Sequence, residues 1–167
     1  LDENVLLFAA ELMAVISDQR RWEASAEMVL RSFALSLLVP ERHYHRVRSY
    51  VETNRIRDGR GDGQKLDYIC VGRPTEISGD RVDPQSLVNK LDFKPRHDLA
   101  PWVRGEVIKR FDFRCCSSIE EFNNIPRMAM TENRHVKFNS ERHQKDDRSR
   151  TVDPRYFVLG WDNTEKK

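Results

Sequence analysis

The sequence predicts an α/β fold with mixed sheets, flanking helices and two lobes. Short apolar runs typical of strands alternate along the chain with segments whose apolar residues recur at helical spacing. A polar connector from Gly72 to Val82 interrupts this alternation once. We therefore expect a single domain over residues 1–167, with lobe one at about 9–72, a connector at about 73–86 and lobe two at about 87–163.

Lobe one shows strand and helix patterns in the order β-α-β-α-β. The strands are expected at 11–16, 34–39 and 66–71, and the helices at 18–33 and 40–54. Ser17 can cap the first helix, whose apolar face leaves Glu27 for solvent. The run 34–39 is apolar almost throughout and stops at Pro40, which is typical of a strand buried on both faces.

Residues 57–64 predict a flexible loop, because three glycines alternate there with charged residues and no apolar side chain is available for burial. The loop contains the tripeptide Arg60-Gly61-Asp62. In a chain without a secretion signal, chance occurrence explains this tripeptide better than an adhesion motif does. The glycine spacing matches neither the phosphate-binding loop of nucleotide hydrolases nor the dinucleotide fingerprint.

Lobe two begins with an apolar run at 87–93 and continues into a third helix. Pro101 suits the first turn of that helix, which extends to about Phe111. Ser117 and Ser118 each precede a glutamate by three residues, and this doubled capping-box pattern predicts a short helix that ends before Pro126. The remaining expected elements are a short strand at 113–116, a hairpin of 128–131 with 136–138, and a strand at 156–161.

Composition limits the class of protein. The chain is 38% hydrophobic and 34% charged, with a net charge of +2, so it can bury a core and carries a heavily solvated surface. Its three cysteines form no C-x-x-C pair, which favours a reduced, cytosolic compartment over a disulfide framework or a zinc knuckle. No apolar run approaches a membrane span, and no signal-peptide pattern is present.

The last third of the chain allows two enzymatic interpretations and a structural one. The candidate metal site would use His135, His143, Asp146 and Asp147, with Lys145 stabilising a phosphoryl group. The candidate nucleophile would be Cys115 or Cys116, which stand in an apolar strand without a histidine nearby in sequence. Because arginines crowd the carboxylates, the favoured hypothesis is that Asp146 and Asp147 pair with arginines or cap backbone N–H groups.

Longer motifs resemble those of a known family. The motifs of the first half are Trp22-Glu23-x-x-x-Glu27, Phe33 to Pro40, His43-Tyr44 and Tyr50-Val51. The motifs of the second half are Lys90-Leu91, Ala100-Pro101-Trp102, Arg110-Phe111-Asp112, Glu121-Phe122, Pro126-Arg127-x-x-x-Thr131, Arg142-His143-x-Lys145-Asp146-Asp147-Arg148 and Val158 to Asn163. In this order they resemble the hinge of MukB-like SMC proteins, in particular the JetC subunit of Wadjet (JetABCD) plasmid-defence systems. The glycine-rich loop at Arg60 to Gln64 departs from that pattern as an insertion.

The resemblance implies a non-catalytic, two-lobed hinge that forms a homodimer within a DNA loop-extruding complex. Leu1 to Phe8 and Thr164 to Lys167 would then be stubs of two coiled-coil arms. The expected partners are a second copy of the hinge and the kleisin, KITE and nuclease subunits of the parent complex, with no membrane. No cofactor is expected in this domain, because ATP and Mg would bind an ABC-type ATPase head that this chain lacks. The implied location is the cytoplasm, in association with the nucleoid.

Two surfaces follow as candidate sites. The expected dimer interface is the apolar side of the hairpin and the last strand: Met128, Met130, Val136, Phe138, Tyr156 and Val158. Equally, these residues could complete the core. The alternative function is DNA binding through the basic ribbon, residues 134–155, which holds seven Lys or Arg against four Asp or Glu. Its expected contacts are Arg134, Lys137, Arg142, Lys145, Arg148 and Arg150. A metal-dependent nuclease is the third hypothesis.

Overall fold

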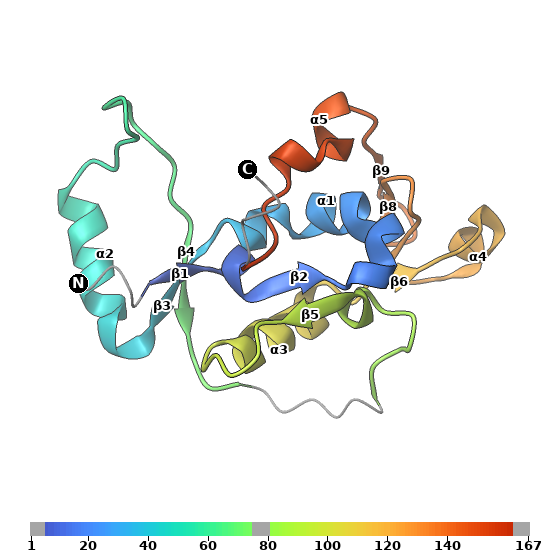
Figure 1. The fold of residues 1–167 in the computed structure, drawn as a ribbon, viewed down its shortest axis with the longest axis horizontal. Helices are drawn as coiled ribbons and strands as arrows, with labels where there is room; N and C mark the ends of the chain where they lie inside the picture. Colours follow the sequence, from blue (N-terminus) through green and yellow to red (C-terminus); the bar gives the residue numbers. More distant parts are fainter. Residues whose placement is uncertain (1–5, 75–80, 162–167) are drawn as a thin grey trace.

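A computed structural model of the chain describes residues 6–74 and 81–161 (Figure 1). The expected arm stubs lie outside these residues, except that Leu7–Phe8 form strand β1. Strand β1 pairs with β3, so Leu7 and Phe8 belong to a sheet and not to a helical arm. The middle of the predicted connector, residues 75–80, also lies outside the described residues.

One sheet and one helix form an end of the molecule (Figure 1). The sheet has the order β1-β3-β4, with β3 at Leu37–Pro40 and β4 at Tyr68–Val71. Strands β3 and β4 are parallel, and helix α2, Glu41–Thr53, lies in the connection between them. The predicted helix after Pro40 and the predicted strand before Gly72 are thereby confirmed, as is the loop between them.

The central part of the molecule joins segments far apart in the sequence. Strand β2, Met13–Val15, pairs antiparallel with β5, Leu91–Phe93, across the expected boundary between the lobes. The helical elements around this pair are η1 at Ala9–Leu12, η2 at Ser17–Trp22, α1 at Glu23–Ala34, η4 at Leu87–Lys90 and α3 at Ala100–Arg110. The first predicted strand therefore belongs to a different sheet from β3 and β4.

A four-stranded sheet holds the last third of the chain. Its order is β6-β7-β8-β9, with β6 at Arg114–Cys115, β7 at Ala129–Met130, β8 at His135–Lys137 and β9 at His143–Lys145. Helix α4, Ile119–Asn124, connects the parallel strands β6 and β7. The Ser118 hydroxyl accepts a hydrogen bond from the N–H of Glu121, which confirms the predicted cap. The hairpin β7–β8 is also as predicted.

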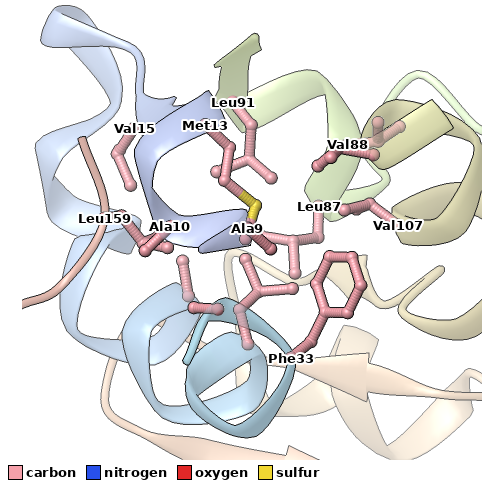
Figure 2. Packing of buried hydrophobic residues seen from close by; sticks show 14 of the residues in the cluster. Ala9, Ala10, Met13, Val15, Phe33, Leu87, Val88, Leu91, Val107 and Leu159 are labelled. Atoms are coloured by element: carbon pink, nitrogen blue, oxygen red, sulfur yellow. The ribbon is translucent and has the colours of Figure 1, made fainter. Parts of the chain in front are cut away.

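The main hydrophobic core lies between β2, β5, α1, α3 and the inner face of the four-stranded sheet. Figure 2 shows Met13 and Phe33 from the first half of the chain packing beside Leu87 and Val107 from the second. The final segment contributes Leu159, which is also buried in this cluster. Because one cluster draws on both expected lobes, the division of the chain into lobes at residues 73–86 stays a hypothesis.

Three sequence-based expectations were wrong. Residues 156–161 form no strand: helix α5 at Ser149–Val152 and η5 at Pro154–Tyr156 precede an irregular segment. Strand β9 was not expected within the ribbon. Glu27, assigned to solvent, is only 4% exposed. Glu27 and the segment after Tyr156 bind each other across a long separation in the sequence, whereas β9 is a short polar strand without the apolar alternation that predicts strands. No helix in the described ranges is long and apolar enough to cross a membrane.

Candidate functional site

Strand β9 is the outer strand of the four-stranded sheet, and no described strand pairs with its other edge. The N–H groups of Phe138 and Asp146 donate to the carbonyls of Arg142 and Arg134, which marks these as hydrogen-bonded pairs. Such pairs alternate in an antiparallel ladder, so the backbone groups of His143 and Lys145 point toward the free edge. All three side chains of β9 are exposed. The molecule thus presents a short, polar strand edge.

The expected dimer interface is not one surface. Met130 and Val136 are completely buried in the core of the single chain, which corrects their assignment to an interface. Met128, Phe138 and Val158 are half-buried and pack against that core. Only Tyr156 is well exposed, at 43%. Alternation along the hairpin indicated correctly that its apolar residues share a face, but this face is already buried in the main core of the single chain.

The carboxylates of the ribbon are held by nearby guanidinium groups. Asp146 accepts hydrogen bonds from the N–H and Nε of Arg148 through Oδ1 and from Nη2, at 2.7 Å, through Oδ2. Asp153 and Arg155 repeat this Asp-x-Arg clamp seven residues later, with an Nη2–Oδ2 distance of 2.7 Å. Asp147 pairs with Arg134 at 3.0 Å and with Lys145. The expectation that Asp146 and Asp147 pair with arginines is confirmed.

These contacts favour the charged form of the carboxylates. Hydrogen bonds from the Arg148 side chain hold the pKa of Asp146 well below its usual value, although burial acts in the opposite direction. The pKa of Asp147 is lowered by the ammonium of Lys145 and also by the guanidinium of Arg134, while desolvation acts in the opposite direction. Both carboxylates are therefore ionised at neutral pH and occupied by cations of the same ribbon.

Most cations proposed to contact DNA consequently already have a partner within the chain. Arg134, Lys145 and Arg148 form the ion pairs just described. Lys137 is only 4% exposed, and its ammonium donates to the carbonyls of Phe122 and Ile125 at the end of α4. This burial corrects its assignment to a DNA contact, because a helix C-terminus is a favourable site for a cation.

Besides the buried Lys137, two cations of the ribbon form no ion pair with any described residue. The guanidinium of Arg142 lies 4.4 Å from the ring centre of Phe138, and that of Arg150 lies 4.9 Å from the ring centre of Tyr156. Both arginines are exposed. A DNA contact through the ribbon therefore depends on Arg142 and Arg150, and this contact stays a prediction.

A buried carboxylate attaches the final segment to α1. The Glu27 carboxylate accepts hydrogen bonds from the N–H of Val158 at 2.8 Å and from that of Leu159 at 2.9 Å. Two residues earlier, the Ser25 hydroxyl donates to the carbonyl of Thr131 and accepts from the N–H of Arg134. Two side chains of α1 thus provide hydrogen-bond partners for backbone groups of the final segment and of the β7–β8 turn, which would otherwise lack them. Periodicity missed this role because Glu27 lies beside the apolar stripe.

Beside the ribbon, a cavity of about 350 Å³ separates α1 from residues 144–157. Its walls carry the carboxylates of Glu27 and Asp146 and the guanidinium groups of Arg31, Arg148 and Arg150. Backbone N–H groups and Arg148 engage the two carboxylates, and Arg31 donates to the carbonyl of Tyr156. Most of the charged groups that line the cavity are therefore paired with one another or with the backbone, and these contacts hold the ribbon against α1.

A second network, centred on the connector, was not identified from the sequence. Asp83 accepts from Arg114 at 2.7 Å and from Arg127 at 2.6 Å, and Arg114 also pairs with Glu121 at 3.0 Å. Despite partial burial, which acts in the opposite direction, these guanidinium groups lower the pKa of Asp83. Arg127 further donates to the carbonyl of Asp112. This network fixes the end of the connector onto β6 and the segment before β7.

The candidate catalytic groups do not converge. Burial raises the pKa of Cys115 to about 12, so its sulfur is a neutral thiol at physiological pH. The rings of His135 and His143 lie 6.4 Å apart and both face Phe122. Across residues 6–74 and 81–161, no three His, Cys, Asp or Glu side chains gather in a way that could hold a metal ion. Both enzymatic interpretations therefore lack support from the geometry.

Comparison with solved structures finds the Smc hinge domain of Pyrococcus furiosus with an extended coiled coil, at a TM-score of 0.51 and 14% sequence identity. The similarity covers 87% of this chain and 50% of that structure, so the chain spans about half the length of the structure that it matches. No protein-family model and no curated protein matches the sequence. At this level of identity the likeness concerns the fold, and it confirms the predicted α/β hinge architecture.

Proposed function

We propose that this chain is the homodimerisation hinge of an SMC-like protein and is non-catalytic by itself. The observation that carries the proposal is the likeness to an SMC hinge over 87% of the chain. The ordered sequence motifs point to the same kind of domain independently of the coordinates. The occupied carboxylates and neutral Cys115 thiol favour a structural role over a catalytic one.

The free edge of β9 is the surface that we assign to the second copy. An unpaired edge offers backbone donors and acceptors at His143 and Lys145, and a two-fold axis would pair this edge with itself. The strand is short and carries a lysine, features that commonly limit unwanted pairing. Pairing through this edge would therefore require support from neighbouring side chains, such as the exposed Ile119 of α4.

Light scattering over a concentration series tests the dimer. We expect a species of twice the 19.7 kDa of one chain at tens of micromolar protein. A single species of monomer mass throughout that range would refute the homodimer.

A proline at position 145 tests the surface. Lys145→Pro removes the outward N–H but leaves the β8–β9 hydrogen bonds in place, so it should weaken the dimer about tenfold or more. Lys145→Ala, which keeps the N–H and loses the same charge, is the matched control and should dimerise like the original chain. Full dimerisation of a folded Lys145→Pro variant would exclude the β9 edge while leaving the hinge proposal intact.

The finer assignment is to a MukB-like subunit of the JetC type in Wadjet plasmid defence. It rests on the motifs at residues 22–40, 126–131 and 142–148. The protein would then act in the cytoplasm at the nucleoid, with kleisin, KITE and nuclease subunits as partners and with ATP and Mg bound by the head of the parent protein. Co-purification of the full-length protein with those subunits, and loss of plasmid exclusion when the hinge is made monomeric, would support this assignment.

A further inference from the structure

The cavity between α1 and residues 144–157 is large enough to hold a small ligand. Helix α5 lies beside α1 in the fold (Figure 1), and the cavity has a volume of about 350 Å³. Small-molecule sites in proteins commonly measure about 300 to 1,000 Å³, so a ligand here would be at the small end of that range. The charge and the shape of such a ligand follow from the groups that line the walls.

Two guanidinium groups, one from each side of the cavity, have no carboxylate partner among the described residues. Arg31 belongs to α1 and Arg150 to α5, and both side chains are exposed. Neither arginine occurs in any described ion pair. A guanidinium group carries five N–H donors, and Arg31 uses one of them, from Nη1 to the carbonyl of Tyr156 at 3.1 Å. Most donors of the two groups are therefore available to a ligand.

Tyr156 positions both guanidinium groups. Its carbonyl accepts the hydrogen bond from Arg31, and the centre of its ring lies 4.9 Å from the guanidinium of Arg150. Long side chains lose conformational freedom when a ligand immobilises them, and this loss weakens binding. Because the fold already restricts Arg31 and Arg150, an anion that contacts both of them pays less of this entropic cost.

The carboxylates in the walls leave positive charge in excess. Both oxygens of Asp146 accept hydrogen bonds from the guanidinium of Arg148. The Glu27 side chain is only 4% exposed, and its carboxylate accepts hydrogen bonds from backbone N–H groups of the final segment. Three guanidinium groups, of Arg31, Arg148 and Arg150, thus stand against two carboxylates, which gives the lining a charge of +1. The preferred ligand is therefore an anion.

The same cavity has an apolar part. Met28 of α1 and Phe157 both line it, and both are half-buried. Apolar side chains of this kind gain free energy by covering carbon atoms of a ligand and gain nothing from a hydrated inorganic ion. The lining thus indicates a ligand that joins an anionic group to a small organic group.

We propose that this cavity binds the phosphate monoester of a small organic molecule. Arg31 and Arg150 contact the phosphate, and Met28 and Phe157 contact the organic group. A monoester suits two guanidinium groups because it is close to doubly charged at neutral pH and offers three oxygens for charge-assisted hydrogen bonds. A nucleic-acid phosphodiester carries one charge and continues as a chain on both sides of the phosphate, which suits an open surface better than a cavity of this size. The proposal does not depend on dimerisation.

Isothermal titration calorimetry with phenyl phosphate, a monoester that contains a small ring, tests the proposal on the 167-residue chain. We expect one equivalent to bind with a Kd of about 1 mM or lower at about 50 mM salt. At ten times that Kd, the ligand should raise the Tm by about 3 °C or more. Inorganic phosphate should bind about threefold or more weakly, because it lacks the organic group. Dimethyl phosphate, a phosphodiester with one charge, should bind about tenfold more weakly.

Three results with these ligands would overturn the proposal. The first is the absence of both a binding heat and a Tm shift with phenyl phosphate. The second is equal affinity for inorganic phosphate, since the cavity would then bind an ion only. The third is equal affinity for dimethyl phosphate, which would point to a nucleic-acid backbone as the source of the phosphate.

Arg150→Gln and Arg142→Gln form a matched pair of variants. Each removes an exposed ribbon arginine that lies against an aromatic ring and has no described ion pair, but only Arg150 lines the cavity. Arg150→Gln should weaken the binding of phenyl phosphate about tenfold or more, whereas Arg142→Gln should change it by less than about twofold. Arg31→Gln, on the opposite wall, should cause a loss similar to that of Arg150→Gln. Equal affinities of the Arg150→Gln and Arg142→Gln variants, or an unchanged affinity in Arg31→Gln, would contradict the assignment of the site.

Discussion

The ribbon and the segment from residue 41 to residue 65 contain equal numbers of charged residues but differ in how many of them are paired. Each holds seven cations and four carboxylates. We call the six exposed arginines of the second segment the α2 surface: Arg42, Arg46, Arg48, Arg55, Arg57 and Arg60. In the ribbon, four of the cations are in ion pairs and Lys137 is buried. On the α2 surface none of the six arginines has a described carboxylate partner. The difference shows that a count of charges along a sequence says little about which charges are available to a partner.

Backbone structure explains the contrast. Helix α2 satisfies its own N–H and C=O groups, so its side chains are free to face solvent. The ribbon contains one three-residue strand and one four-residue helix, and it must find other partners for its backbone. Asp146 and Asp153 provide them by accepting both a backbone N–H and a guanidinium group. Most cations of the ribbon therefore bind groups of the same chain and are not available to a partner.

The largest effect on stability is expected in the final segment, just after the ribbon. Glu27→Ala removes the acceptor for the N–H groups of Val158 and Leu159 and should lower the free energy of unfolding by about 2 to 4 kcal/mol, because buried donors lose a charged partner. Urea denaturation measures this loss. Glu23→Ala, one turn earlier on α1, removes only a surface pair with Arg20 and should cost less than about 1 kcal/mol. Equal losses in the two variants would show that the final segment is not anchored by Glu27.

A smaller effect should follow from breaking one Asp-x-Arg clamp. Asp146→Asn should destabilise the chain by about 1 to 2 kcal/mol near neutral pH, since the Asp146 side chain is 8% exposed and its bonds to Arg148 are charge-assisted. Asp153→Asn breaks the same clamp at a side chain that is 24% exposed, so its cost should be lower. If Asp153→Asn cost more than Asp146→Asn, burial would not be what strengthens the clamp.

The clamp also predicts the direction of the pH dependence. The pKa of Asp146 is lower in the folded chain than in the unfolded one, so its contribution is fully present above about 4 and is lost as the pH falls further. Asp83 contributes in the same direction. Thermal denaturation between about pH 2 and 5 should therefore show a weaker loss of stability in Asp146→Asn than in the original chain. Parallel curves would exclude this linkage.

Local signals predicted much of the fold. Periodicity identified α2 and α3, the serine cap identified α4, and alternation identified the β7–β8 hairpin, because each of these patterns reports short-range geometry. Strand β9 was not predicted because its residues are polar and show no apolar alternation. The irregular segment after Tyr156 was not predicted because it depends on Glu27, which is distant in the sequence. The pairing of β2 with β5 escaped for the same reason.

The candidate surfaces were predicted less well than the fold. Alternation assigned Lys137 to the solvent side of the hairpin, but α4 covers that side and offers two carbonyl groups to the ammonium. The pairing of Asp146 and Asp147 was predicted correctly, because arginines two residues away or across the strand pair are close in an extended ribbon. The α2 surface was overlooked although its arginines are as dense as those of the ribbon, since availability depends on where the carboxylates point.

The smallest effect on stability is expected on the α2 surface itself. Arg42→Glu/Arg46→Glu removes no ion pair among the described residues and exposes no buried group, so the free energy of unfolding should change by less than about 0.5 kcal/mol. The two glutamates repel each other one turn apart as the two arginines do, so the interaction between these positions stays about the same. Urea denaturation of this variant, beside Asp146→Asn, gives the comparison directly. A loss as large as that of Asp146→Asn would mean that Arg42 and Arg46 are occupied within the fold, and the distinction between the two basic regions would disappear.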